Sequence, residues 1–536
     1  MSSEAPAQAW KILITDPIPE GCIDTLRSEK RIRVENHPGI TSDELLTAIR
    51  SCHGLIVRSG ATISASILEA APDLEVIVRA GTGVDNIDLP SATARGIVVM
   101  NTPGGNTISA AEHTICLMLS LSRNIPRAAA SVRAGEWDRG RFVGVEVAGK
   151  TLGIVGMGRV GRAVASRARG LEMEVVGFDP YLSEDVIAEM KVTPVSFERM
   201  LETADYLTFH VPLTERTRNM LGKAELQRCR RGIRIVNCAR GGLIDEAALE
   251  EAIDEGIVSG AALDVFETEP PRNRSLLARE EVIATPHLGA STVEALDNVG
   301  EAAARQLLDY FTRQVIRGAV NTVDLDARLL SESAPLRDLA KRLGSVQGQV
   351  MGEGLDQIAI SFLGEALDAS VQEILALSFL QGFFEHSLDA PVNLVNARHI
   401  AHEKGVRVTQ STGPRSRGYS FLIDTRVAGK EGEHVLSGSL FGDESGRIVG
   451  FDGFDIEARP EGWMLLMASR DAAGMIGRMG SIIGDGGVNI ANLSLGRDES
   501  GGRAVSIFNI DSAAPPDVLD GLKGLDGVLW VRQVQV

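Results

Sequence analysis

The sequence predicts an α/β protein in which two doubly wound parallel-sheet domains precede an α+β domain and a small ferredoxin-like domain. From Lys11 to about Asn321, short apolar runs rich in β-branched residues alternate with turns and amphipathic helical patterns. Near-continuous apolar strands separated by helices are typical of parallel sheets covered on both faces. After Asn321 this rhythm ends, and from Trp463 onward the pattern reads β-α-β-β-α-β, which indicates a ferredoxin-like unit.

Length and composition favour a soluble, cytoplasmic protein of several domains. The 536 residues exceed what one hydrophobic core holds, and 44% hydrophobic with 24% charged residues argues against a disordered or membrane-embedded chain. A net charge of -18 and only 4% aromatic residues argue against binding to nucleic acid or to anionic membranes. The five cysteines are scattered without a C-x-x-C pair, and the N-terminal segment lacks a basic start and an apolar core. We therefore expect no disulfides, no metal site and no signal peptide.

A glycine-rich loop, Gly156-Met-Gly158-Arg-Val-Gly161, directly follows a short apolar strand and precedes a helical pattern. Its glycines allow a tight turn against a pyrophosphate, whose charge would lie at the N-terminus of the helix. A second strand ends at Asp179, 18 positions after Gly161, close to the spacing expected for a carboxylate on an adenosine ribose. Since a carboxylate repels a 2′-phosphate, the sequence predicts NAD over NADP. The alternative is a glycine turn with a surface Asp, which the strand-loop-helix-strand order disfavours.

Four further apolar runs of this region end in polar residues. In an open parallel sheet the ligand lies outside the carboxyl ends of the strands, so these ends face the same crevice as the glycine loop. The polar residues at or just beyond these ends that we expect to converge there are Arg240, Asp264, Glu269 and His287.

This set suits hydride transfer from a hydroxyl-bearing carbon. Imidazole gains and loses a proton near neutral pH, so His287 is the candidate that removes the hydroxyl proton. Glu269 would orient the imidazole, and the planar guanidinium of Arg240 would hold a carboxylate. Each residue alone has a structural alternative, as a helix cap, a solvated loop residue or an ion-pair partner. Their common location favours function.

These residues resemble the D-isomer-specific 2-hydroxyacid dehydrogenases. The matching segments, which together span nearly all of residues 10–320, are 81–88, 101–112, the glycine loop, 237–245, 262–271 and 286–291. The resemblance implies that Arg240, Glu269 and His287 form the catalytic set, in a cleft between two Rossmann-like domains. It implies NAD contacts at Thr82, Gly156, Gly158, Arg159, Val160, Gly161, Asp179, Cys238, Ala239, Asp264 and Gly289.

The resemblance extends to the long members of this family that oxidise D-3-phosphoglycerate. It implies a substrate-binding domain of residues 1–100 plus 291–322, an NAD-binding domain of 101–290, an intervening domain of 323–457 and a regulatory domain of 458–536. The segment Pro391-Val-Asn-Leu-Val-Asn-Ala397 supports the intervening domain, to which we assign no ligand. A homotetramer is the expected assembly.

Substrate identity depends on two arginines of the first domain. Arg58 and Arg79 each end an apolar run, and two guanidiniums can bind a phosphate. The family's phosphoglycerate members use matching positions, and Arg139 adds a third arginine across a subunit boundary. The expected substrate contacts are Arg58, Ser59, Arg79, Gly81, Asn106 and Arg139. The expected reaction is NAD-dependent oxidation of D-3-phosphoglycerate to 3-phosphohydroxypyruvate, the first step of L-serine biosynthesis.

The last domain resembles an ACT domain, a regulatory module that binds small molecules. The resemblance rests on Ser469-Arg-Asp471-Ala-Ala-Gly474-Met-Ile-Gly477 and Gly487-Val-Asn489-Ile. It implies that Asp471 and Asn489 bind L-serine as an effector, although Ala473 stands where Pro is usual. The alternative is a purely structural role in dimerisation.

Two other functions remain open from the sequence. The first is another D-2-hydroxyacid dehydrogenase, of the glycerate or glyoxylate type. The second is an NAD-sensing binding protein similar to a corepressor. The set of Arg240, Glu269 and His287, together with the appended regulatory module, favours an enzyme.

Overall fold

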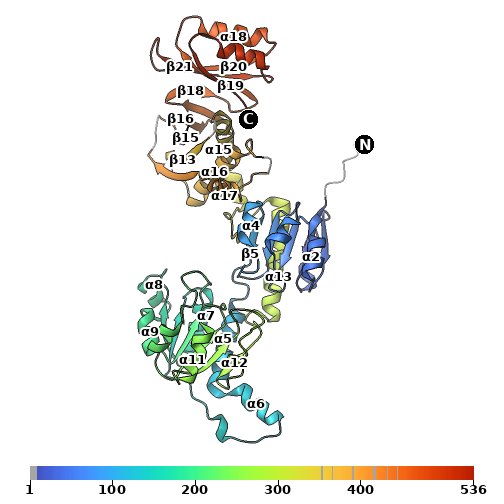
Figure 1. Cartoon of the computed structure of the whole chain (residues 1–536), viewed down its shortest axis with the longest axis vertical. Coiled ribbons are helices and arrows are strands. Elements are labelled where there is room, and N and C mark those ends of the chain that lie inside the picture. Colours follow the sequence, from blue (N-terminus) through green and yellow to red (C-terminus); the bar gives the residue numbers. More distant parts are fainter. Residues whose placement is uncertain are drawn as a thin grey trace.

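Within the residues that it describes, the computed structural model contains four β-sheets that follow one another along the chain (Figure 1). It describes residues 9–351, 354–364, 366–388, 391–414, 418–430, 432–442 and 445–536. Residues 1–8, where the sequence predicts no signal peptide, lie outside the described residues. The molecule is elongated, with the second sheet near one end and the fourth at the other. The predicted order of two parallel-sheet domains, an α+β domain and a ferredoxin-like domain is confirmed.

The first sheet has five parallel strands in the order β2-β1-β3-β4-β5. Its strands are β1 (Trp10–Ile14), β2 (Ile32–Asn36), β3 (Gly54–Val57), β4 (Val76–Arg79) and β5 (Val98–Asn101). The helical segments between them are α1 (Glu20–Arg27), α2 (Ser42–Ala48), η1 (Ile49–Ser51), α3 (Ala65–Glu69) and α4 (Leu89–Ala94). The strand order reverses between β1 and β3, so their carboxyl ends form the crevice where such sheets bind ligands.

The second sheet has seven parallel strands in the order β8-β7-β6-β9-β10-β11-β12. Its strands are β6 (Thr151–Val155), β7 (Glu174–Phe178), β8 (Thr193–Pro194), β9 (Tyr206–Phe209), β10 (Ile233–Asn237), β11 (Val258–Leu263) and β12 (Val282–Ala284). Its helices are α7 (Arg159–Gly170), α8 (Glu184–Glu189), α9 (Phe197–Thr203), α10 (Lys223–Arg228), α11 (Glu246–Asp254) and α12 (Arg274–Leu277). This is the Rossmann strand order, extended by one strand.

Two long helices connect the first two sheets, α5 (Thr107–Arg123) and α13 (Val293–Arg313). Helix α5 packs in the core of the second sheet, whereas α13 packs in the core of the first, so the chain returns to the first sheet after residue 290. Helix α6 (Ile125–Arg133) and the turn η2 (Gly140–Phe142) belong to an arm, residues 124–145, that projects from the second sheet (Figure 1). Neither α5, α13 nor any other helix in the described part of the chain is long and apolar enough to cross a membrane.

The third sheet is mixed, with strand order β14-β13-β15-β16-β17-β18 and one parallel pair, β13 with β14. Its strands are β13 (Leu355–Gly364), β14 (Arg407–Gly413), β15 (Phe421–Gly429), β16 (Gly432–Leu440), β17 (Gly446–Phe451) and β18 (Phe454–Ala458). Its helices are α15 (Ala334–Val350), α16 (Ala369–Phe384) and α17 (Ala397–Glu403), whereas the short helix α14 (Ala327–Glu332) packs against the core of the first sheet. Helices α15 and α16 touch backbone to backbone, because a Cβ on Gly344 would lie 2.0 Å from the Phe379 carbonyl oxygen.

The fourth sheet is antiparallel, in the order β20-β21-β19-β22, which is the ferredoxin-like order that the sequence predicts. Its elements are β19 (Trp463–Arg470), α18 (Met475–Asp485), β20 (Ile490–Arg497), β21 (Arg503–Ile510), α19 (Pro516–Lys523) and β22 (Val528–Gln535).

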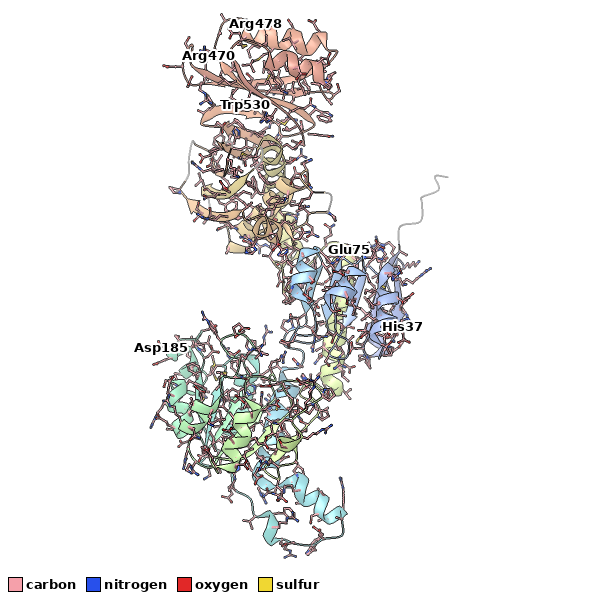
Figure 2. The ribbon with its side chains drawn as sticks, viewed as in Figure 1. His37, Glu75, Asp185, Arg470, Arg478 and Trp530 are labelled. Carbon is pink, nitrogen blue, oxygen red and sulfur yellow. The ribbon has the colours of Figure 1, made fainter. Side chains whose placement is uncertain are left out.

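The third and fourth sheets share one hydrophobic core. Successive side chains of β19 point to opposite faces, so Leu465 packs against the core under α18 and α19 while Leu466 packs into the core of the third sheet. Trp530 lies where the two sheets meet (Figure 2), with its ring 5.7 Å from the ring of His434 and 5.9 Å from that of Phe451.

The segment 391–397 joins the third sheet to the first. Val395 and Ile374 are buried in the core of the first sheet. The side-chain amide of Asn393 donates a hydrogen bond of 2.8 Å to the Gly96 carbonyl oxygen, just before β5. The motif that supports the resemblance to an intervening domain therefore attaches this domain to the first sheet.

Leu466→Ala tests the shared core. Leu466 is fully buried, so we expect its truncation to lower the free energy of unfolding by about 2 to 5 kcal/mol. Amide hydrogen exchange should accelerate over both residues 355–458 and 463–535. Leu465→Ala is the matched control, because Leu465 is equally buried but faces the helices, and its effect should stay within 463–535. The same exchange pattern in both variants would contradict a shared core.

Candidate active site

A cavity of about 690 Å³ lies between the first and second sheets, at the carboxyl ends of their strands. Both sheets and the two connecting helices contribute to its lining. The predicted site residues that line it are Arg58, Ser59, Arg79, Gly81, Thr82, Asn106, Arg159, Val160, Cys238, Ala239, Arg240 and His287. The fold therefore gathers in one cavity residues that are far apart in the sequence.

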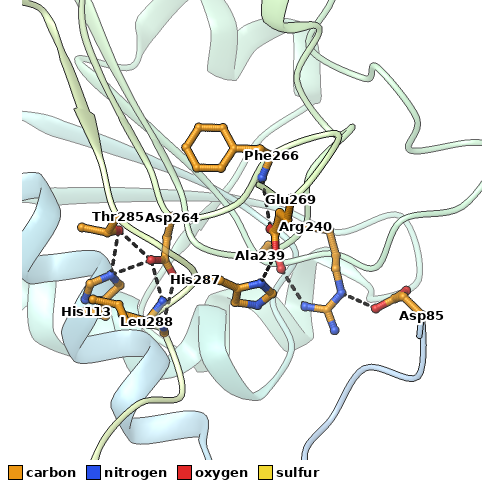
Figure 3. A network of polar contacts seen from close by, with 11 residues as sticks. Asp85, His113, Ala239, Arg240, Asp264, Phe266, Glu269, Thr285, His287 and Leu288 are labelled. Atoms are coloured by element: carbon orange, nitrogen blue, oxygen red, sulfur yellow. Dashed lines mark hydrogen bonds and ion pairs between the residues drawn. The ribbon is translucent and has the colours of Figure 1, made fainter. Parts of the chain in front are cut away.

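A hydrogen bond joins His287 to Glu269 at this cavity (Figure 3). Nδ1 of His287 lies 2.8 Å from Oε2 of Glu269, and Oε1 of Glu269 accepts a hydrogen bond from the Phe266 N–H. Burial raises the pKa of Glu269, but the hydrogen bond and charge of His287, with the Phe266 N–H, outweigh burial and lower it. An ionised carboxylate fixes the proton on Nδ1 of the neutral imidazole, which leaves Nε2 as the acceptor.

Arg240 is held by a contact between the two sheets (Figure 3). Its Nε donates to Oδ2 of Asp85 at 2.8 Å, and its Nη1 donates to the Ala239 carbonyl oxygen at 2.6 Å. Gly83 leaves the space that this guanidinium fills, because a Cβ there would lie 1.7 Å from Nη2 of Arg240. Asp85 was not predicted as a site residue. Its partner, Arg240, lies 155 positions away, and local sequence patterns do not reveal contacts between residues so far apart.

Arg58 and Arg79 present a concentration of positive charge to the cavity. The Nε atoms of both are buried and have no hydrogen-bond partner among the described residues. Burial, followed by the charges of Arg240 and Arg58, lowers the pKa of Arg79 to about 10, and burial also lowers the pKa of Arg58. A bound anion would offset the repulsion between these positive charges.

Asp16, at the end of β1, orders the loop that carries Arg58. Its Oδ2 accepts a hydrogen bond of 2.9 Å from the Arg58 N–H, and its Oδ1 accepts one of 2.8 Å from the Gly60 N–H. Asp16 is itself buried, so these backbone donors satisfy a carboxylate that would otherwise be costly. The backbone at Arg58 is thereby fixed at the reversal point of the first sheet.

The glycine loop has the geometry of a pyrophosphate cradle. Gly156 has a φ of +93°, and a Cβ on it would lie 2.6 Å from the His210 carbonyl oxygen. A Cβ on Gly161 would lie 2.1 Å from the Gly156 carbonyl oxygen, so the loop can close onto α7 only with glycine there. Beside Gly158 there is open space within 4 Å of the Cβ position, where a pyrophosphate fits.

Asp179 lies beside this loop, as the spacing predicts. Its Oδ2 accepts a hydrogen bond of 2.9 Å from the Met157 N–H, and its Oδ1 accepts one of 3.0 Å from the Tyr181 N–H. The carboxylate is thus held at the end of β7, next to the glycine turn, where it can accept further hydrogen bonds from a ribose. The loop and Asp179 together fit NAD.

Other predicted residues lie outside the lining of the cavity. Asp264 is fully buried, and its carboxylate accepts hydrogen bonds of 2.8 Å from the N–H groups of Leu288 and Gly289. Arg139 lies on the arm beside Trp137, with its guanidinium 5.9 Å from the indole ring. Neither residue is among those that line this cavity.

His210 lines the cavity at the end of β9, although it is absent from the predicted site. Burial lowers the pKa of His210 to about 3, so its imidazole is neutral at physiological pH. The strand end at His210 is visible in the sequence, but nothing local distinguishes a lining residue from the end of a buried strand.

The fold and the site define an NAD-dependent dehydrogenase of the D-isomer-specific 2-hydroxyacid type. Residues 115–289 match the NAD-binding domain of D-isomer-specific 2-hydroxyacid dehydrogenases, and residues 334–452 match the D-3-phosphoglycerate dehydrogenase intervening domain. The chain is 38% identical to D-3-phosphoglycerate dehydrogenase of Archaeoglobus fulgidus, over 98% of this chain and 100% of that one. It is 37% identical to the enzyme of the same name from Bacillus subtilis, over the same shares of both chains. The chain belongs to the D-3-phosphoglycerate dehydrogenase family.

Solved structures are similar to part of the chain. The TT0316 protein of Thermus thermophilus superimposes with a TM-score of 0.53 at 34% identity, over 58% of this chain and 99% of that one. A glyoxylate reductase from Paecilomyes thermophila gives a TM-score of 0.54 at 28% identity, over 58% of this chain and 98% of that one.

Glu269→Gln tests the contact of Glu269 with His287. The variant keeps the shape of the side chain but removes the charge that stabilises the imidazolium, so kcat should fall about 10²-fold or more while NADH affinity stays the same. Steady-state kinetics and NADH fluorescence titration measure the two effects. Glu267→Gln removes the same charge from an exposed neighbour and should leave kcat unchanged. Equal kcat values for the two variants would refute the role of Glu269.

Asp179→Ala tests the cofactor site. Loss of a charged acceptor for the ribose should raise the Kd of NADH about 10- to 100-fold and reduce the preference for NADH over NADPH. Asp185→Ala, an exposed position on α8 (Figure 2), is the control and should bind both cofactors like the wild type. An unchanged Kd for NADH in Asp179→Ala would contradict the assignment.

Proposed function

We propose that this chain oxidises D-3-phosphoglycerate to 3-phosphohydroxypyruvate with NAD, the first step of L-serine biosynthesis. The observation that carries the proposal is the group of Arg58, Arg79 and Arg240 at one cavity, with Arg79 buried enough for its pKa to fall to about 10. Such a site favours a small substrate with more than one negative charge. The names of the near full-length relatives support the same substrate.

Each end of the substrate has a matching group. Arg58 and Arg79, which line the cavity, bind the phosphate through their guanidinium groups, and Arg240 binds the carboxylate. Because Asp85 holds Nε of Arg240, the guanidinium keeps a fixed orientation and offers Nη2 to the substrate. Ser59, Gly81 and Asn106 complete the proposed substrate contacts.

His287 moves the proton of the reaction. Its Nε2 accepts the proton of the substrate hydroxyl, while Glu269 stabilises the imidazolium through Nδ1. NAD, when bound, accepts the hydride that leaves the same carbon. In the reverse direction His287 returns the proton to the carbonyl oxygen.

The proposed cofactor contacts are Thr82, the glycine loop with Arg159 and Val160, Asp179, Cys238, Ala239, Asp264 and Gly289.

The proposed function assigns a role to each domain of the chain. Residues 1–100 with 291–322 bind the substrate, 101–290 bind NAD, 323–457 form the intervening domain and 458–536 form an ACT domain. We propose L-serine as the effector at Asp471 and Asn489. Asp471 is paired with Arg497 at 3.0 Å and Asn489 donates to Asp511 at 2.8 Å, so serine would exchange with these partners.

The proposed assembly is a cytoplasmic homotetramer. Four apolar side chains of the arm are more than half exposed, which favours burial against another chain. They are Ile125, Val132, Trp137 and Val143. An arm that contacts a second subunit would also bring Arg139 toward a neighbouring substrate site.

A double substitution of Arg58→Ala and Arg79→Ala tests the substrate. Loss of two charge-assisted contacts should raise KM for D-3-phosphoglycerate by at least about 10²-fold and change KM for D-glycerate far less. NADH absorbance measures both reactions. Arg50→Ala, an exposed arginine of the same domain, is the control. Equal changes for both substrates would favour an unphosphorylated hydroxy acid, and no turnover by the wild type with any hydroxy acid would favour an NAD-sensing protein.

A further inference from the structure

A buried carboxylate beneath the active site anchors the loop that carries His287. Asp264 is fully buried at the end of β11 and accepts four hydrogen bonds (Figure 3). The donors are the Thr285 hydroxyl at 2.6 Å, the N–H groups of Leu288 and Gly289 at 2.8 Å each, and Nε2 of His113 at 3.1 Å. The Asp264 carbonyl oxygen also accepts a hydrogen bond of 2.9 Å from the His287 N–H. Asp264 therefore holds the residues on both sides of His287, the proposed acid/base.

The loop needs such an anchor because the backbone of His287 is strained. Its φ is +56°, in the left-handed region that residues other than glycine seldom adopt. A strained conformation persists only where the surrounding contacts determine it. Around His287 those contacts are the hydrogen bonds to Asp264 on one side and the hydrogen bond with Glu269 on the other.

His113 is the only one of the four donors that comes from outside the loop. It lies on α5, which connects the first two sheets, and its side chain is 18% exposed. An ionised carboxylate only accepts, so Nε2 of His113 carries a proton that it shares between Asp264 and the Thr285 hydroxyl oxygen, 3.3 Å away. Burial raises the pKa of Asp264, but the hydrogen bonds of His113, Thr285 and Leu288 outweigh burial and lower it. His113 thus helps to keep the buried anchor ionised.

We propose that His113 is a positioning residue of the dehydrogenase, which acts through Asp264 to hold the loop of residues 285–289 with His287 in its reactive place. This rests on the proposed function of His287. His113 does not line the cavity and takes no part in proton transfer to substrate. Without its N–H, the carboxylate loses the donor that α5 supplies, and the loop loses its link to the helix between the domains. Small displacements of a catalytic group lower kcat strongly.

His113→Leu and His113→Gln form the test. Leucine keeps apolar volume without a donor, whereas the glutamine amide donates from about the place of Nε2. We expect kcat with D-3-phosphoglycerate to fall about 10- to 100-fold in the leucine variant, with KM within about 2-fold of the wild type, and to recover in the glutamine variant. Hydrogen exchange over residues 285–289 should accelerate with leucine and return toward the wild-type rate with glutamine. His402→Leu, whose side chain is 87% exposed, is the control.

The outcomes separate this inference from the proposed function. Wild-type kcat and exchange in His113→Leu, or equal losses in both variants, would overturn a positioning role. If the leucine variant does not fold, His113→Asn, whose amide is too short to reach Asp264, replaces it with the same expected loss. If the wild type does not oxidise D-3-phosphoglycerate, the proposed function fails, and the exchange rates of residues 285–289 alone decide whether His113 holds the loop.

Discussion

The site depends on two arginine side chains that lie next to each other at the ends of adjacent strands. Strands β3 and β4 pair in parallel, so Arg58 and Arg79 leave the first sheet side by side. Burial of like charges is costly unless other groups compensate them. Asp85, which also accepts a hydrogen bond from Arg240, and Asp16 compensate part of this charge. The positive charge that remains favours the binding of a small anion at this site. The net charge of -18 for the whole chain disfavours only the binding of extended polyanions.

The second sheet contributes the cofactor site and the proposed acid/base, which the first sheet lacks. Its glycine loop and Asp179 fit the cofactor, and the loop between β12 and α13 carries His287. Neither sheet alone forms the cavity, since its lining comes from both. Helices α5 and α13 fix the two halves relative to each other, and the contact of His113 with Asp264 links one of these helices to the His287 loop. The geometry of the site is therefore coupled to the connection between the domains.

Features that depend on local order could be predicted from the sequence. The glycine loop, Asp179 and the polar strand ends follow from strand, turn and helix patterns within a few residues of each other. Asp85, His113 and the bond from Asn393 to Gly96 could not, because each depends on a partner more than 150 positions away. Asp264 stays a proposed NAD contact, while the structure shows that its carboxylate also accepts hydrogen bonds from backbone and side-chain donors. A strand-end carboxylate that faces a ligand and one that anchors a loop have the same sequence signature.

A structure of the chain with NAD and D-3-phosphoglycerate bound tests the proposed substrate binding and the role of His287 most directly. It should place phosphate oxygens within hydrogen-bond distance of the guanidinium groups of Arg58 and Arg79, the carboxylate on Arg240, and the substrate hydroxyl against Nε2 of His287. A phosphate bound away from both arginines, or a hydroxyl out of reach of His287, would contradict these proposals.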